Sequence, residues 1–177
     1  PAYLTGDRLS LRPMLPEDAE HATAWFESPF PINSTRAAAL LKEVHTRAWG
    51  EADPLYLAVV RLVDETIVGG ATIDGHSGPH GVLRVRSAPW LPDEESDALR
   101  AEVLGLVVPW LRDELELMTV TVDIAADDPA ALAAATALGM VLGVRLREHV
   151  VRPDGRVDLL QFQALNPGRR VLERADA

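Results

Sequence analysis

The chain has no cysteine and only one lysine, Lys42, among its 177 residues. Without cysteine it can form no disulfide, use no thiol nucleophile and bind no metal through thiolates. A formal net charge of -10, without clustered basic residues, argues against binding to nucleic acid or to an anionic membrane surface. No secretion leader or membrane-length apolar run is present, so we expect a cytoplasmic protein.

Metal centres and serine nucleophiles also lack their sequence signatures. His76 and His80 are separated by a Gly/Pro loop and have no third ligand beside them in the sequence. No Gly-x-Ser-x-Gly string occurs. We therefore expect neither a metal site nor a serine hydrolase.

The length and the 47% hydrophobic content are sufficient for one well-buried core and short for two. We expect a single domain over residues 1–165. The polar tail, residues 166–177, is expected to be mobile or to form contacts between the subunits of a homodimer.

The first half of the chain alternates between strand and helix patterns. Residues 3–12 are typical of a strand with a bend at Gly6-Asp7, and residues 16–26 of a helix that Ser28-Pro29-Phe30-Pro31 ends. Asn33 or Ser34 can cap a second helix over 37–49. Residues 55–63 and 67–73 then predict an antiparallel hairpin.

A strand over 82–88 leads through an acidic turn into a long helix over 93–115, and this unit organises the rest of the chain. Such a turn points backbone N–H groups at the space in front of the helix, where many enzymes bind phosphate. Pro109 costs the helix a hydrogen bond and predicts a kink or a break near Val108.

The last part of the chain predicts one more strand, a short helix and a terminal hairpin. The strand covers 117–125, and the helix covers 129–138 with Gly139 as its C-cap. Residues 144–152 and 157–165 flank a Pro153-Asp154-Gly155-Arg156 turn. The whole order predicts a mixed α/β fold, a mostly antiparallel seven-stranded sheet flanked by about four helices.

Several strings in this order resemble the RimJ/RimL-like branch of the GNAT superfamily, the acyl-CoA-dependent N-acetyltransferases. They are Leu4-Thr5-Gly6-Asp7-Arg8-Leu9-Ser10-Leu11-Arg12-Pro13, Ile67-Val68-Gly69-Gly70, Ala137-Leu138-Gly139-Met140 and Asp154-Gly155-Arg156. The resemblance covers roughly residues 3–165 and implies a GNAT-type domain that acetylates a small amine or a peptide N-terminus.

The resemblance also implies where acetyl-CoA would bind. Its pantetheine arm would enter a V-shaped opening between the strands at 82–88 and 117–125, and its pyrophosphate would meet backbone amides of the helix that follows the first of them. The residues placed around the cofactor are Ser87, Ala88, Ala98, Leu99, Arg100, Ala101 and Asp128.

The phosphate turn departs from the family's Arg/Gln-x-x-Gly-x-Gly/Ala pattern. Glu95, Ala98 and Arg100 occupy its first, central and final defined positions. The Cβ of Ala98 narrows the approach to the backbone, and one like-charge contact near 4 Å costs about 1–4 kcal/mol. The four carboxylates within 93–97 therefore predict weak or absent acyl-CoA binding. The same acids are, alternatively, ordinary first-turn residues of a solvated helix.

Acyl transfer to an amine needs a base that accepts the ammonium proton. Asp74 and His76 follow the strand at 67–73, and Asp123 lies on the strand at 117–125, so all three are candidates. Each also has the alternative of a surface or structural role. Ala131 stands where the family often has a serine, so a hydroxyl that could protonate the leaving thiolate is missing.

Arg84 and Arg86 occupy one face of a central strand. They are expected either to bind an anionic group of the acceptor or to pair with Asp123. Trp25 is a candidate wall of the acceptor site. Two functions remain open: an N-acyltransferase, and a GNAT-fold protein that has lost acyl-CoA binding and serves as a binding, regulatory or repurposed domain.

Overall fold

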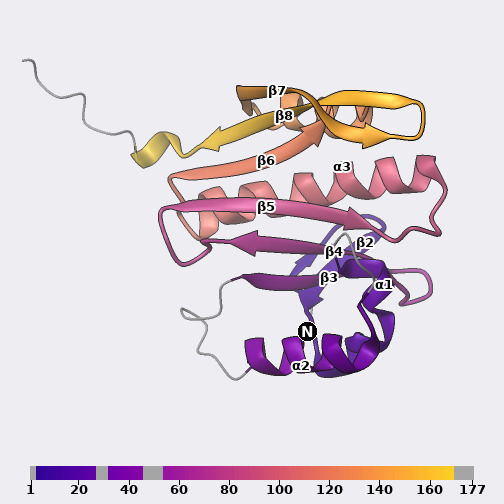
Figure 1. The fold of residues 1–177 in the computed structure, drawn as a ribbon. Helices are drawn as coiled ribbons and strands as arrows, with labels where there is room; N and C mark the ends of the chain where they lie inside the picture. Colours follow the sequence, from indigo (N-terminus) through magenta and orange to yellow (C-terminus); the bar gives the residue numbers. More distant parts are fainter. Residues whose placement is uncertain (1–2, 27–31, 46–53, 170–177) are drawn as a thin grey trace, which may run out of the picture.

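The computed structural model describes residues 3–26, 32–45 and 54–169. They form a mixed α/β fold around one eight-stranded sheet in the order β1-β2-β3-β4-β5-β6-β8-β7 (Figure 1). The strands are β1 (Leu4–Thr5), β2 (Leu9–Pro13), β3 (Leu55–Arg61), β4 (Ile67–Asp74), β5 (His80–Ser87), β6 (Thr119–Ala125), β7 (Val141–Arg152) and β8 (Gly155–Leu165). Neighbouring strands are antiparallel except β5 and β6. The predicted fold class is thus confirmed.

The sheet has one strand more than predicted because the first strand is a small hairpin. The amide of Gly6 donates to the carbonyl of Leu9 at 2.8 Å. This turn folds β1 back onto β2, and Leu4 pairs with Leu11. The expected bend at Gly6-Asp7 is therefore a reversal of the chain.

The helices begin and end close to their predicted positions. They are the 3-10 helix η1 (Pro16–His21), α1 (Ala22–Trp25), α2 (Ser34–His45), α3 (Asp93–Pro109), the π-helical turn η2 (Trp110–Glu114), α4 (Pro129–Ala137) and the 3-10 turn η3 (Pro167–Arg169). The predicted helix over 16–26 is thus a 3-10 turn followed by one α-helical turn. The break at 28–31, the end of the second helix near 49 and most of the polar tail lie outside the described residues.

Local sequence signals explain several of these helix boundaries. The Asn33 side chain accepts a hydrogen bond from the Arg36 amide at 2.8 Å, as expected for an N-cap. Pro109 ends α3 and the chain continues as a π-helical turn, so the predicted break is confirmed. Gly139 follows α4 with a φ of 68°, a conformation that favours glycine at a helix C-terminus.

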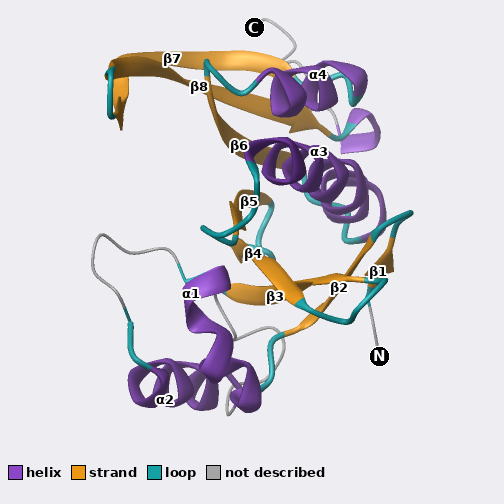
Figure 2. Cartoon of the chain, turned by 90° about the vertical axis from the view of Figure 1, so that its right-hand side faces the viewer, coloured by secondary structure: helices purple, strands orange, loops and turns teal. Residues whose placement is uncertain are grey.

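Helices cover both faces of the first half of the sheet but only one face of the second half (Figure 2). One core lies between the sheet and α3 and α4, and it includes Leu83, Val103 and Val122. A second core lies between the sheet and the N-terminal helices, and it includes Trp25 and Leu41. None of the described helices is long and apolar enough to cross a membrane.

The two central strands part in the middle of the sheet. β5 and β6 pair from His80 opposite Thr119 to Leu83 opposite Val122, and no pair follows although both strands continue. This split is the opening that the resemblance implied.

Candidate functional site

A cleft of about 830 Å³ lies at the split between β5 and β6 and extends to the start of α3 and of α4. Its apolar walls include Val85, Leu104, Val122 and Ile124. Its charged lining consists of Asp93, Asp97, Asp123, Asp127, Asp128, Arg100 and Arg152. The cleft therefore has an apolar end between the strands and an acidic end near the helices.

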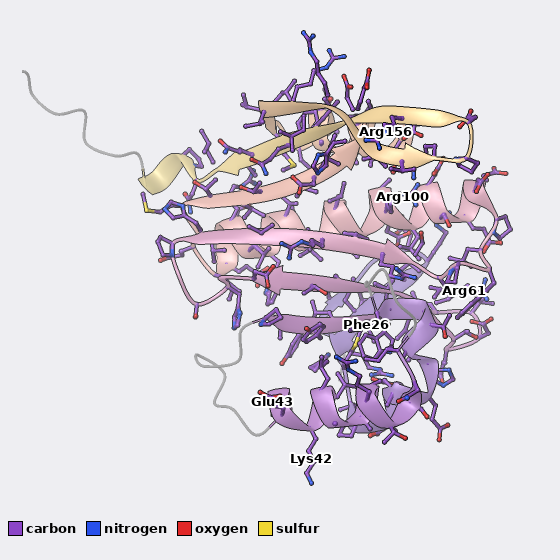
Figure 3. The ribbon with its side chains drawn as sticks, viewed as in Figure 1. Phe26, Lys42, Glu43, Arg61, Arg100 and Arg156 are labelled. Atoms are coloured by element: carbon purple, nitrogen blue, oxygen red, sulfur yellow. The ribbon has the colours of Figure 1, made fainter. Side chains whose placement is uncertain are left out.

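The side chain of Arg100 bridges the two arms of the split. It projects from α3 (Figure 3) and donates to Ser87 Oγ at the end of β5 at 3.1 Å. Its Nε atom donates to Asp128 Oδ2, just after β6, at 2.5 Å. A third bond joins its Nη2 to Asp97 Oδ1 at 2.5 Å. One guanidinium thus connects β5, α3 and the start of α4.

The second arginine of the cleft, Arg152, is also paired with an aspartate. Arg152 Nε donates to Asp127 Oδ2 at 2.8 Å, and this hydrogen bond lowers the pKa of Asp127. Asp128 caps α4 by accepting from the Ala131 amide at 3.0 Å. Five aspartates and two arginines line the cleft, so it carries a formal excess of three negative charges. Both arginines are already paired with aspartates.

The amides that open α3 are those of Asp93, Glu94 and Glu95, and the cleft extends to Asp93. α3 begins directly after Pro92, which has no side chain able to cap the helix, and its first hydrogen bond runs from the Ser96 amide to the Pro92 carbonyl at 2.9 Å. The three earlier amides precede this bond and lack a helical acceptor. The amides of Ala98 to Ala101, which were expected to face the cofactor, lie one turn inside the helix.

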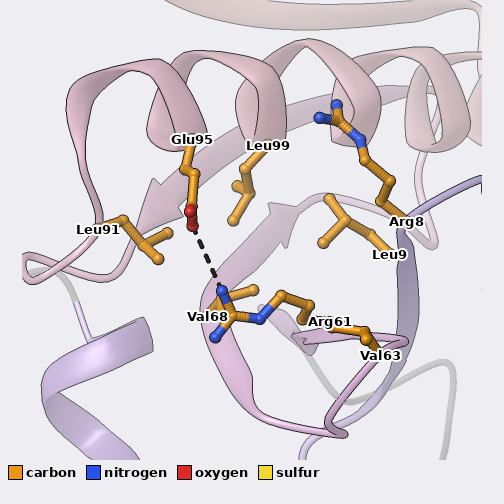
Figure 4. A pocket seen from close by; sticks show the side chains of 8 residues that line it. All are labelled: Arg8, Leu9, Arg61, Val63, Val68, Leu91, Glu95 and Leu99. Atoms are coloured by element: carbon orange, nitrogen blue, oxygen red, sulfur yellow. Dashed lines mark hydrogen bonds and ion pairs between the residues drawn. The ribbon is translucent and has the colours of Figure 1, made fainter.

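Other predicted cofactor residues also point away from the cleft. Leu99 is buried and lines a separate pocket of about 340 Å³ together with Leu9 and Val68 (Figure 4). Glu95 lines the same pocket and forms an ion pair with Arg61 of β3 at 3.3 Å. Ala88 is buried in the second core, and its amide donates to the Val68 carbonyl. Of the four acids in the turn, only Asp93 and Asp97 line the cleft.

GNAT acetyltransferases generally use acetyl-CoA, and the backbone of this cleft fits such a ligand. The split accepts a narrow arm, the volume suits a large cofactor, and three helix-start amides are available for an anion. The aspartates oppose the diphosphate electrostatically, and Arg100 is already occupied. The site therefore fits acyl-CoA in shape and in backbone donors, with a charge penalty at the phosphate end.

A second pocket, of about 340 Å³, lies beside the N-terminal helices on the opposite face of the sheet. It is lined by Trp25, Phe26, Pro54, Tyr56, Thr72, Asp74 and Arg84. Trp25 contacts Phe26 and Tyr56 edge to face, with ring centroids 6.0 and 6.3 Å apart. We call this pocket the acceptor pocket.

Gly70 of β4 allows Trp25 to pack directly on the sheet. A Cβ atom at Gly70 would lie 2.7 Å from the Trp25 Cβ, closer than side chains approach one another. A glycine inside a strand weakens the strand, but here it leaves room for the Trp25 ring to pack on β4.

The polar end of the acceptor pocket contains Asp74, Arg84 and Tyr56. Arg84 of β5 donates to Asp74 of β4, so the alternative pairing of Arg84 with Asp123 is wrong. Burial raises the pKa of Tyr56, and the charge of Asp74 raises it further. The Tyr56 phenol therefore stays protonated at neutral pH and can donate a hydrogen bond to a ligand.

The three candidate bases lie in different places. Asp123 is the first β6 residue beyond the last pair with β5, where it lines the cleft and accepts from Gln161 at 3.0 Å. Asp74 lines the acceptor pocket. His76 is buried in the turn after β4 and lines neither of these two sites. Of the three, only Asp123 lies at the split itself.

Of the two arginines predicted to bind substrate, Arg84 forms an ion pair with Asp74, whereas Arg86 has no acidic partner among the described residues. It lies opposite Gly70, on the same face of β5 as Arg84. Its Nε atom is buried and has no hydrogen-bond partner. Within the described part of the chain, no ion pair involves Arg86.

Sequence reasoning missed several residues that shape the two sites. Tyr56 and Phe26 line the acceptor pocket, and Asp127 and Arg152 line the cleft. Strand alternation could have indicated Tyr56. It pairs with Thr72, which lies on the same face of β4 as Asp74. The cleft charges carry no local signal, since they come from separate elements.

No family model matches the chain, and no curated protein matches it. Among solved structures, a "putative acetyltransferase" from Sphaerobacter thermophilus is 49% identical, with a TM-score of 0.72 over 92% of this chain and 97% of that chain. A ribosomal-protein-S5-alanine acetyltransferase from Vibrio fischeri is 13% identical, with a TM-score of 0.64 over 92% and 96% of the two chains. A spermidine/spermine N-acetyltransferase from Vibrio cholerae is 15% identical, with a TM-score of 0.63 over 91% and 95%.

The split sheet, with a cleft on one side and a pocket on the other, is the architecture of an acyltransferase domain. Together with the 49% identity over nearly the full length of both chains, it shows that this chain belongs to the GNAT superfamily of N-acetyltransferases. The ribosomal-protein acetyltransferases among its structural neighbours agree with the RimJ/RimL-like resemblance. The neighbours under 25% identity support the fold alone.

Proposed function

We propose that the protein transfers an acyl group from acyl-CoA to the amine of a small molecule or of a peptide N-terminus. The observation that carries this proposal is that the two sites lie on opposite faces of β5. Val85 lines the cleft and Arg84 lines the acceptor pocket. Both residues lie just beyond Leu83, where β5 separates from β6. A donor and an acceptor bound in the two sites would approach each other through the split.

The cleft residues divide between two parts of the cofactor. Val85 and Ile124 are positioned to contact the pantetheine arm, while the amides of Asp93 to Glu95 and the Arg100 guanidinium are the donors available for the phosphates. When bound, acyl-CoA supplies the acyl group as a thioester. The aspartates around Arg100 are expected to make this binding weak.

The chain's own residues hold the amine and receive its proton. The aromatic walls of the acceptor pocket, Trp25 and Tyr56, enclose the body of the acceptor. Asp123 is the carboxylate at the split, where it can accept the ammonium proton directly or through water. Asp74 is paired with Arg84 in the acceptor pocket and is not among the residues that line the cleft, so it is assigned to binding and not to proton transfer.

Two substitutions separate these roles. With acetyl-CoA and a panel of amines, Asp123→Asn is expected to lower kcat by about 10²–10⁴-fold with little change in the KM of the amine. Asp74→Asn is expected to raise that KM and to leave kcat near the wild-type value. A folded Asp123→Asn protein with full kcat would refute the assignment of the base.

A second function is favoured by one observation, the position of Arg100. Its side chain spans the cleft and its three bonds go to protein groups. A protein in which this arrangement is permanent would keep the GNAT fold as a binding or regulatory domain without acyl transfer. Calorimetric titration decides: no heat and no thermal shift with acetyl-CoA or CoA at millimolar concentration would favour this second function.

A further inference from the structure

We infer that the acceptor is a free α-amino acid whose carboxylate binds Arg86. The inference rests on the proposed function, because it names the substrate class of the acceptor pocket. It is carried by Arg86, which has no hydrogen-bond or ion-pair partner among the described residues, and by its position next to the split.

Arg86 is a half-buried cation that no acid of the described residues compensates. Its Nε atom is inaccessible to solvent and makes no hydrogen bond, and no acid of the described chain pairs with it. A buried N–H donor without an acceptor is unfavourable, and an unpaired charge that is partly withdrawn from water adds to this cost. A ligand carboxylate would satisfy both, and arginine is the side chain best suited to bind it in a bidentate manner.

The position of Arg86 fits an anion next to the reacting amine. Arg86 lies two residues beyond Arg84 on the same face, so the two side chains are about 7 Å apart along β5. It lies three residues beyond Leu83, the last β5 residue that pairs with β6. Arg86 therefore lies on the arm of β5 that runs beyond the last pair with β6, next to Arg84 of the acceptor pocket.

An α-amino acid matches this order of sites. Its carboxylate and its amine are attached to the same carbon, so a carboxylate on Arg86 brings the amine to the split, near Asp123. Its side chain then points into the acceptor pocket, whose walls include Trp25, Phe26 and Tyr56. Such walls favour an apolar or aromatic side chain.

Acceptors without a carboxylate fit less well. A polyamine would bring positive charge to a face that already carries Arg84 and Arg86, and it would leave Arg86 without an acceptor. A peptide N-terminus has an amide in place of the carboxylate, so it would offer Arg86 a neutral carbonyl only.

Binding without any acyl donor tests the inference directly. Three probes share one aromatic body: L-phenylalanine, L-phenylalaninamide and phenethylamine. Calorimetry or thermal shift on the wild-type protein should show L-phenylalanine binding about 10- to 100-fold more tightly than the other two, the range expected for a charge-assisted hydrogen bond. Equal binding of the three probes would overturn the inference.

Variants assign the effect to Arg86. Arg86→Gln should remove the preference for L-phenylalanine, and Arg86→Lys, which keeps the charge, should retain part of it. Arg147→Gln is the matched control, because it removes the same charge from an exposed position on β7. If Arg86→Gln does not fold, Arg86→Lys still tests the inference with the same three probes. If Arg86→Lys bound L-phenylalanine as tightly as the wild-type protein and preferred it to the same degree, the role of the bidentate guanidinium would be overturned.

The same probes separate this inference from the proposed function. With acetyl-CoA present, mass spectrometry should detect N-acetylphenylalanine. Carboxylate-dependent binding without any acetylated product would refute acyl transfer and leave the recognition site standing. Acetylation of phenethylamine as efficient as that of L-phenylalanine would refute the recognition site and leave acyl transfer standing.

Discussion

The aspartates that surround Arg100 lead to the prediction that Asp97→Asn strengthens the binding of CoA. Asp97 Oδ1 lies 2.5 Å from Arg100 Nη2, and both residues line the cleft. The substitution removes one negative charge from the phosphate end and weakens the hold on the guanidinium. Arg100 then becomes available to a phosphate while Asp128 still orients it.

The expected size follows from Coulomb's law. Two unit charges about 5 Å apart interact by about 1–3 kcal/mol when the effective dielectric constant lies between roughly 20 and 80. The side chain of Asp97 is 36% exposed, so solvent screening favours the lower part of this range. Since each 1.4 kcal/mol is a factor of ten, we expect CoA to bind about 5- to 20-fold more tightly.

Isothermal titration with CoA at low ionic strength measures this change. Glu94→Gln is the matched control, because Glu94 belongs to the same helical turn but is exposed and does not line the cleft. The gain from Asp97→Asn should shrink as salt is added. The reasoning is refuted if Asp97→Asn and Glu94→Gln change the affinity equally, or if Asp97→Asn weakens binding.

Two further predictions concern the acceptor side and the stability of the N-terminal region. Asp18 is buried and accepts from Arg12 at 2.6 Å; burial alone would raise its pKa, but this hydrogen bond and others lower it. Asp18→Asn should therefore cost about 2–3 kcal/mol, or about 4–10 °C in Tm at neutral pH. Because the folded-state pKa is lowered, this stabilisation is present above the unfolded-state pKa of about 4 and is lost as the pH falls through the folded-state value, so thermal melts of the two proteins should converge in acid. Gly70→Ala should push Trp25 away from β4, which should lower the free energy of unfolding by about 1–3 kcal/mol and weaken acceptor binding. Gly105→Ala is the control, because no atom lies near the new methyl group, and it should leave binding unchanged. Equal effects of the two substitutions in thermal melts and titrations would contradict the packing argument.

The sequence predicts those parts of the fold that depend on local signals. Asn33 caps a helix, Pro109 ends one, and Gly139 follows one, each because a single residue type suits that backbone position. Strand alternation places Arg84 and Arg86 on one face without knowledge of the fold.

The candidate site is harder to predict because its partners are distant in sequence. Arg100 and Asp128 are 28 residues apart, and no local pattern relates them. The family pattern places the phosphate amides by counting residues to Ala98. In the structure α3 begins directly after Pro92, so the amides without a helical acceptor are those of Asp93 to Glu95. The same alignment places Glu95 at the phosphate, whereas its side chain forms an ion pair with Arg61.

Two residues at the split carry most of the functional argument, and their roles were only partly visible in the sequence. Asp123 is one of three candidate bases until the β5–β6 pairing ends beside it. Arg86 is one of two equivalent arginines until Asp74 pairs with Arg84 and leaves Arg86 alone. In both cases the choice depends on strand register, which residue order alone does not give.

The most direct test of the central claim is a transfer assay in which the purified protein is incubated with acetyl-CoA and an equimolar mixture of amino acids, amino acid amides and simple amines. The products are identified by mass spectrometry. The split, the acceptor pocket and Arg86 predict N-acetylated amino acids with apolar or aromatic side chains as the main products, and their loss in the Asp123→Asn protein. Absence of any acetylated product from the folded wild-type protein at saturating acetyl-CoA would contradict the claim that a donor and an amine meet between β5 and β6.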